Sequence, residues 1–365
     1  METQFSYSTP KEETNPDLLH TKDTSYRSSK HLTLASPIFK AMLRNTFSEG
    51  TTLLTIGQVK VSLPEDDPTV MTNLVFLIHG RHGHPDIDHV ITLDSLNKAA
   101  ILVDKYHMHE AVAFFTTTWT LSYFNRHAIR LHSFRDFPLL FCVSWVFELE
   151  EPFKEITRII QYNTVGSIKD MMKGTGIDLP IPEGVIGKYI SYPLFRRSTN
   201  TSLPEKLETA RLAAIGDTIQ VLANLIAKYQ DNNGITMCKV DGNQLPDINQ
   251  LHIHKDRCDA TVLGSLMRGA TKEGLWPPAL TESLRNSSVY AVKQKVVGVE
   301  FTTGCEGLRD LLPWPQRYDP YRILSSHGIR DQMRVSIEEA EGRLRGLDLK
   351  VERERFVGPL LARYR

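Results

Sequence analysis

The sequence predicts an α+β protein in which a helical cluster with a short sheet is followed by a mostly α-helical C-terminal region. Residues 59–63 alternate apolar and polar in the manner of a half-buried strand. Most other segments carry apolar residues at helical spacing. The 365 residues, 41% of them apolar, are enough for two or three cores at about 150 residues per domain. We expect a division into residues 1–25, 26–124, 125–230 and 231–365.

The first elements follow from composition and spacing. Residues 1–25 are polar and have no period, so we expect a disordered tail. A helix is predicted over residues 28–43, with a serine at its start as the cap. The strand at residues 59–63 comes next, with one face buried.

Three more helices complete the expected first module. Asp67 is placed as N-cap and Pro68 as the first residue of a helix that ends at Gly80. The other two run over residues 93–106 and 110–124. The expected core residues of this module are Leu32, Phe39, Leu74, Ile78, Leu96, Val103 and Tyr106.

The rest of the chain is expected to form helices joined by loops, with mixed but mainly helical structure over residues 231–365. Helices are predicted over residues 135–165, 204–229 and 259–270. A polar terminal helix is predicted to begin at Ser336, because Ser336 and Glu339 have the spacing of a capping box.

Net charge and cysteine content indicate which partners and which cellular compartment to expect. The formal net charge is +0, which gives no long-range attraction to nucleic acid or to an anionic membrane. We therefore expect protein partners, with no direct nucleic-acid contact and no membrane. Four cysteines are too few for a disulfide framework. The start lacks an apolar stretch of signal-peptide length, so we expect the nucleus or the cytoplasm.

Several segments together carry a family resemblance. SSKHLTLASPIFKAML, FSEG, LPEDDP, LVFLIHGR, ITLDSL and LVDKY resemble the BTB/POZ domain, most closely its fungal branch. TARLAAIGDTIQVLANLIAKY, CDATVLGSLMRGATKEGLWPP and IEEAEGRLRGLDL are similar to the helical C-terminal part of those fungal proteins. The resemblance implies a BTB/POZ-like domain over residues 26–124, no catalytic residue and no cofactor. It also implies self-association or partner docking, as an adaptor for a cullin-type ubiquitin ligase or in a nuclear regulatory complex.

One departure from the family concerns its first hairpin. The family places two strands before the first helix, but residues 21–27 do not alternate and have little to bury. We therefore expect the hairpin to be lost or degenerate. Its loss would weaken the expectation of a homodimer and would expose a sheet edge.

Five residues near the C-terminus form a candidate structural zinc site: Cys238, His252, His254, Cys258 and Cys305. Zinc favours such nitrogen and sulfur ligands. His254 and Cys258 are four apart and would share a helix face, whereas His252 and His254 would share one face of a strand. The alternative is that these are buried free cysteines and surface histidines.

A phosphate-handling enzyme is the other alternative. Arg81-His82-Gly83 is similar to the histidine phosphatase motif, but it follows a helix instead of a strand. A solvated loop explains it better, because a bare tripeptide is a weak motif. Residues 184–189 lack the spacing of a phosphate loop. We therefore expect a protein that is not an enzyme.

Overall fold

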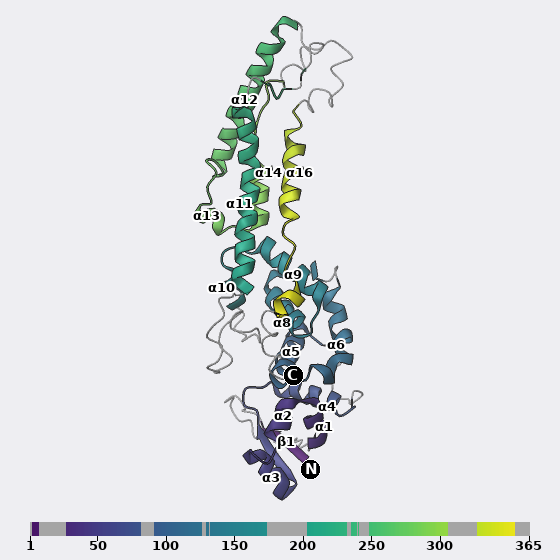
Figure 1. Cartoon of the computed structure of the whole chain (residues 1–365). Helices are drawn as coiled ribbons and strands as arrows, with labels where there is room; N and C mark the ends of the chain where they lie inside the picture. Colours follow the sequence, from purple (N-terminus) through teal and green to yellow (C-terminus); the bar gives the residue numbers. More distant parts are fainter. Residues whose placement is uncertain are drawn as a thin grey trace, which may run out of the picture. The chain divides into compact units, whose positions relative to one another are not determined.

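The computed structural model of the chain describes residues 2–6, 27–81, 91–125, 129–130, 132–173, 203–231, 235–238, 240, 248–305 and 327–354. These residues divide into two compact units. The first unit holds the described residues of Met1–Ile156 and Leu347–Arg365, and the second holds those of Thr157–Gly174 and Thr201–Gly346. Both units consist mainly of helices (Figure 1).

The first unit contains a three-stranded sheet in the order β2-β1-β3. β1 (Glu2–Ser6) pairs antiparallel with β2 (Arg27–Ser28) and parallel with β3 (Gln58–Ser62). The predicted strand is confirmed by β3, which buries every second residue. The expected disordered tail is wrong for residues 2–6.

The first hairpin is therefore short but present, contrary to expectation. β1 does not depend on apolar alternation, because β3 supplies its backbone partners along its whole length. Its Phe5 ring lies 5.6 Å from the ring of Phe39, and Thr3 hydrogen-bonds Ser29 in the interior. These two contacts attach the strand to the helices behind it.

The helix predicted over residues 28–43 is divided in two. α1 (Ser29–Ala35) ends before Ser36, and α2 (Pro37–Met42) begins at the proline. Ser36 has extended backbone geometry, as expected for a residue before proline, and its hydroxyl caps α2 by accepting the Phe39 N–H. α3 (Ser48–Ile56) then leads into β3.

The three helices predicted next are confirmed as α4 (Pro68–Ile78), α5 (Leu93–Tyr106) and α6 (His109–Phe124). Asp67 caps α4 by accepting two backbone N–H groups, and Gly80 follows the helix end with a positive φ of 71°. Of the seven expected core residues six are buried, whereas Ile78 is half-buried.

The first unit continues beyond residue 124, where the first module was expected to end. η2 (Phe134–Asp136) leads into α8 (Phe137–Val146), most of which is buried and which packs against α5. A helix buried on all sides belongs to the core of its unit. α9 (Glu150–Asn163) follows, and the C-terminal segment returns to α8, where Arg353 donates to the carbonyl of Trp145 at 2.8 Å.

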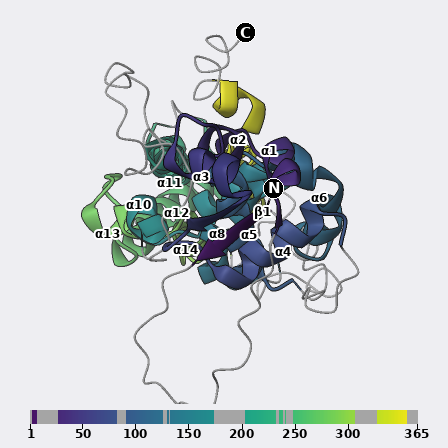
Figure 2. The same ribbon diagram turned by 90° about the horizontal axis from the view of Figure 1, so that it is seen from below.

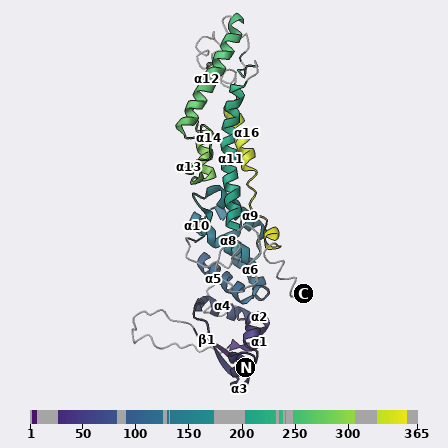
Figure 3. The same cartoon turned by 60° about the vertical axis from the view of Figure 1, so that its left-hand side comes forward.

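The second unit is a bundle around α11 (Leu203–Gln230). α12 (Leu251–Lys272), α14 (Val289–Val297) and α16 (Ile329–Glu341) all pack against it (Figures 1 and 3). The shorter elements of the unit are α10 (Ile168–Lys173), η4 (Ile248–Gln250) and α13 (Glu282–Arg285).

Two predicted helix boundaries in this unit are wrong. α12 begins at Leu251, two turns before residue 259, and α16 begins at Ile329 instead of Ser336. Ser336 lies inside α16, so its spacing to Glu339 does not mark a helix start. The boundary expected after residue 230 also falls within this unit.

Among the described helices, α11 alone is long and apolar enough to cross a membrane by length and composition. Half of its apolar window is buried inside the structure. Its apolar stripe, which includes Ile215, Leu222 and Ile226, belongs to the core that it shares with the other helices of the bundle. These properties are also those of a core helix in a globular bundle.

Candidate functional site

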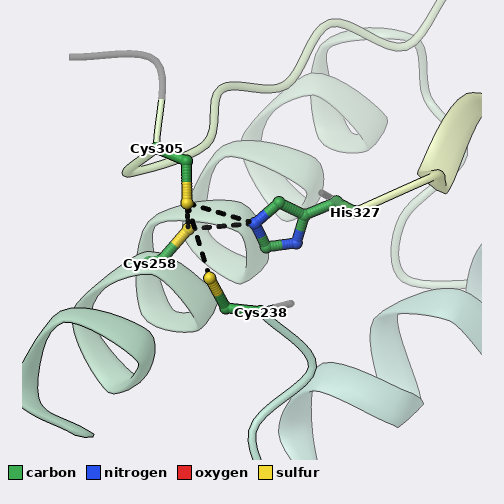
Figure 4. Close-up of side chains that lie close together, drawn as sticks. All are labelled: Cys238, Cys258, Cys305 and His327. Carbon is green, nitrogen blue, oxygen red and sulfur yellow. Dashed lines mark hydrogen bonds between the residues drawn. The ribbon is translucent and has the colours of Figure 1, made fainter. Parts of the chain in front are cut away.

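Four side chains with metal-binding atoms come together in the second unit. They are Cys238, Cys258, Cys305 and His327, and their sulfur and ring-nitrogen atoms all lie within 4.8 Å of one another. The three cysteines are buried and the histidine is half-buried. In Figure 4 all four point toward a common centre, Cys258 from α12 and the others from the connecting segments. We call these four residues the Cys/His cluster.

The Cys305 thiol approaches all three of the other donor atoms of the cluster. Its Sγ lies 3.4 Å from that of Cys238, 3.3 Å from that of Cys258 and 3.7 Å from Nε2 of His327. Cys258 lies 3.1 Å from the same nitrogen. A disulfide requires sulfurs about 2.0 Å apart, so these three thiols are free.

The segment that carries Cys238 is held to α12 beside Cys258. The Met237 N–H donates to the carboxylate of Asp259 at 2.6 Å. Asp259 directly follows Cys258 on the helix, so one hydrogen bond links the neighbours of two cluster residues. Burial raises the pKa of Asp259, while the hydrogen bond from Met237 opposes that shift.

The segment that carries Cys305 lies against α12 over two turns. Ser265 bonds both the carbonyl and the N–H of Thr302. Gly269 and Gly304 permit the close approach, because a Cβ at either position would lie within 3.0 Å of a backbone atom of the facing segment. These contacts place the Cys305 thiol over Cys258.

His327 is oriented by α11. Its Nε2 faces the thiols and its Nδ1 lies 3.2 Å from the hydroxyl of Tyr229. Burial lowers the pKa of His327, but hydrogen bonds that its protonated ring donates to the sulfurs of Cys238 and Cys258 outweigh burial and raise the pKa to about 9. Burial also raises the pKa of the Tyr229 phenol, which therefore stays neutral.

The pKa values of two of the cluster thiols are shifted in opposite directions. Hydrogen bonds from Cys258 and Cys305 lower the pKa of Cys238, whereas its contacts with Cys238 and Cys258 raise the pKa of Cys305. Three neighbouring thiolates repel one another in a buried place unless a cation lies among them. The cluster is therefore a set of soft donors suited to a metal ion.

The structure separates the five predicted zinc ligands into two groups. Cys238, Cys258 and Cys305 are brought together as predicted. His252 is not, because its side chain is 78% exposed and pairs with Asp256 at 2.8 Å. A strand would have placed His252 and His254 on one face, but α12 begins at Leu251, and a helix turns residues two apart onto different faces.

The histidine of the cluster was missed by sequence reasoning. His254 approaches only Cys305, at 3.5 Å, and is not one of the four residues. His327 lies 22 residues from Cys305 and 69 residues from Cys258, so no local spacing pointed to it. His82 and residues 184–189, considered above for phosphate chemistry, lie outside the described residues.

A second candidate site is the outward surface of α6 in the first unit. Phe114 is 84% exposed and Leu121 is 68% exposed, and they lie two helical turns apart with Thr117 and Thr118 between them. No Asp, Glu, Lys or Arg occurs from Ala111 to Phe124. We call Phe114, Thr117, Thr118 and Leu121 the α6 face. The helix lies at the edge of its unit (Figure 2).

Comparisons with known proteins identified no relative of this chain. No family model matches the chain, and neither a curated protein nor a solved structure matches it. The BTB/POZ resemblance stays a prediction from the sequence.

Proposed function

We propose that this protein is a non-catalytic association protein that pairs with a second copy of itself through the α6 face. The observation that carries the proposal is the combination of high exposure and missing charge on this helix. A surface helix ordinarily presents polar and charged residues to solvent. Protein interfaces, by contrast, have central regions depleted of charge and enriched in aromatic residues.

A second copy is the occupant that fits this surface. An interface on a two-fold axis must be complementary to itself, and an uncharged face does not repel its own copy. The chain as a whole carries a formal net charge of +0, so long-range repulsion between copies is small as well. A membrane or nucleic acid would be attracted by basic residues, which the α6 face lacks.

The BTB/POZ resemblance supports the same proposal, because it implies a module for self-association and docking. Under this proposal the first unit binds the first unit of a second copy. The resemblance implies two roles for such a dimer: an adaptor for a cullin-type ubiquitin ligase, or a component of a nuclear regulatory complex.

Sedimentation velocity of the full chain tests the proposal. We expect the unaltered protein to sediment as a dimer, and the double variant Phe114→Ser with Leu121→Ser to sediment as a monomer at the same concentration. Val165→Ser is the matched control, because Val165 is an apolar residue of the second unit that is also 68% exposed. This control should sediment as a dimer.

Three results would contradict the proposal. The unaltered chain could remain a monomer at every concentration, or the double variant could remain a dimer while its circular dichroism is unchanged. A monomeric chain that instead captures a different protein, with capture lost in the double variant, would replace self-association with docking of an unlike partner.

A further inference from the structure

We infer that Cys238, Cys258, Cys305 and His327 bind one Zn²⁺ ion in a closed, tetrahedral structural site. This inference is independent of the proposed self-association, because it concerns the second unit alone. It rests on the donor set, the spacing of the donor atoms, their burial and the small apolar core around them.

The donor atoms have the spacing of a tetrahedral zinc site. Zn–S bonds of about 2.3 Å and Zn–N bonds of about 2.1 Å place two sulfurs about 3.8 Å apart and a sulfur and a nitrogen about 3.6 Å apart in a tetrahedral site. The measured separations around Cys305 are 3.4 Å and 3.3 Å to the two sulfurs and 3.7 Å to the nitrogen of His327. Sγ of Cys258 lies 3.1 Å from the same nitrogen. The shorter of these separations would have to widen by about 0.5 Å to admit the ion (Figure 4).

The number of ligands indicates a structural role. Catalytic zinc sites have three protein ligands and leave a fourth position for water or substrate, whereas structural sites use four. Here three thiols and one imidazole supply four ligands, and all three cysteines are buried. Thiolate sulfur and imidazole nitrogen in a tetrahedral arrangement are typical of zinc.

The part of the second unit around the cluster has a small apolar core. Its hydrophobic cluster consists of Cys238, Val240, Cys258 and Cys305, with Leu251 packed against it. The main core of the unit is a separate set of residues. A metal ion would join α12 to three connecting segments where apolar burial is small, as structural zinc does in domains with small cores.

His327 is a better fourth ligand than His254. Nε2 of His327 approaches both Cys258 and Cys305, whereas His254 approaches Cys305 alone. The other nitrogen of His327 bonds the hydroxyl of Tyr229. Metal-binding histidines generally have such a partner on the second nitrogen, which fixes the ring and its tautomer.

The first experiment measures metal in the full-length protein purified in reducing buffer. We expect one zinc per chain by elemental analysis. After chelation, titration with Co²⁺ should give the intense visible absorption of tetrahedral cobalt together with a thiolate charge-transfer band. Protein without stoichiometric metal that also fails to bind Zn²⁺ or Co²⁺, or protein that contains copper or iron instead, would overturn the inference.

The second experiment assigns the ligands by variants read out with Zn²⁺ competition. His327→Ala, Cys258→Ser and Cys238→Ser should each bind zinc more than about 100-fold more weakly, since the loss of a direct ligand exceeds the loss of its hydrogen-bonding partner. His252→Ala, at the exposed histidine, and Cys142→Ala, at the cysteine of the first unit, are matched controls that should keep full affinity.

The comparison of two histidines keeps the assignment falsifiable even if cysteine variants fail to fold. His254→Ala should retain one zinc per chain and the cobalt spectrum. If His254→Ala loses the metal and His327→Ala keeps it, the four-ligand set stated here is wrong.

Discussion

The backbone at Gly304 lies directly on the α-carbon of Cys258: a Cβ at position 304 would stand 2.9 Å from that atom. This is a closer approach than carbon atoms tolerate, so any larger residue must move the segment away from α12. The adjacent Cys305 would move with it. The distance between two cluster thiols therefore depends on the absence of a side chain at residue 304.

Gly304→Ala should weaken both the second unit and its metal site. The forced displacement is a case of overpacking, which costs about 1–3 kcal/mol. We expect a lower unfolding midpoint in urea and weaker zinc affinity in a chelator competition. Gly264→Ala is the matched control, because Gly264 lies in α12 and a Cβ added there would meet no atom within 4 Å. That change should be neutral or stabilising.

Tyr229→Phe should weaken zinc binding without removing a ligand. The phenol hydroxyl is 3.2 Å from Nδ1 of His327, and it holds the ring with Nε2 toward the thiols. Loss of such a partner generally costs about 10–100-fold in metal affinity. Tyr290→Phe, at a half-exposed tyrosine of α14, is the control and should leave affinity unchanged. Equal zinc affinity in the Tyr229 variant and the control would show that the hydroxyl does not position His327.

Elements of the first unit were predicted correctly where their structure depends only on residues next to each other in the sequence. Asp67 and Pro68 begin α4 as expected, because capping and proline geometry depend only on neighbouring residues. Residues 2–6 were missed, since their strand exists through pairing with β3, more than fifty residues later. A polar sequence carries no local sign of such a partner.

The Cys/His cluster shows the same limit. Three of its members were predicted from residue type, but His327 was not, and His252 and His254 were predicted in its place. His252 and His254 both lie in α12, which begins at Leu251. Residues two apart share one face of a strand but lie on different faces of a helix, so the two histidines do not point the same way. Which histidine meets the thiols is therefore decided by packing between α11, α12 and α16.

Replacing Arg211 should lower the free energy of unfolding of the second unit substantially. Its guanidinium is buried, pairs with Glu208 and donates to the carbonyls of Arg285 and Ser287. Arg211→Met removes this donor from two carbonyls and from the carboxylate of Glu208, which is 27% exposed, and we expect a loss of about 1–3 kcal/mol. Urea unfolding should show the loss. Arg268→Met, at an exposed position of α12, should change the free energy of unfolding by less than about 0.5 kcal/mol.

Asp104 makes the stability of the first unit depend on pH. Burial raises its pKa from 3.8 to about 6, although nearby His107 and Arg353 oppose the shift. The folded state therefore holds this proton more tightly than the unfolded state does, so stability is lost as the pH rises from about 4 through about 6. Asp104→Asn has no proton to lose at this position.

Urea unfolding of the wild type and of Asp104→Asn at pH 4, 5, 6 and 7 checks this expectation. The free energy of unfolding of the wild type should fall relative to that of the variant between pH 4 and pH 6, and the difference should change little between pH 6 and pH 7 compared with the change between pH 4 and pH 6. The opposite sign, with the wild type gaining on the variant as the pH rises, would mean that Asp104 is stabilised in the folded protein as a carboxylate.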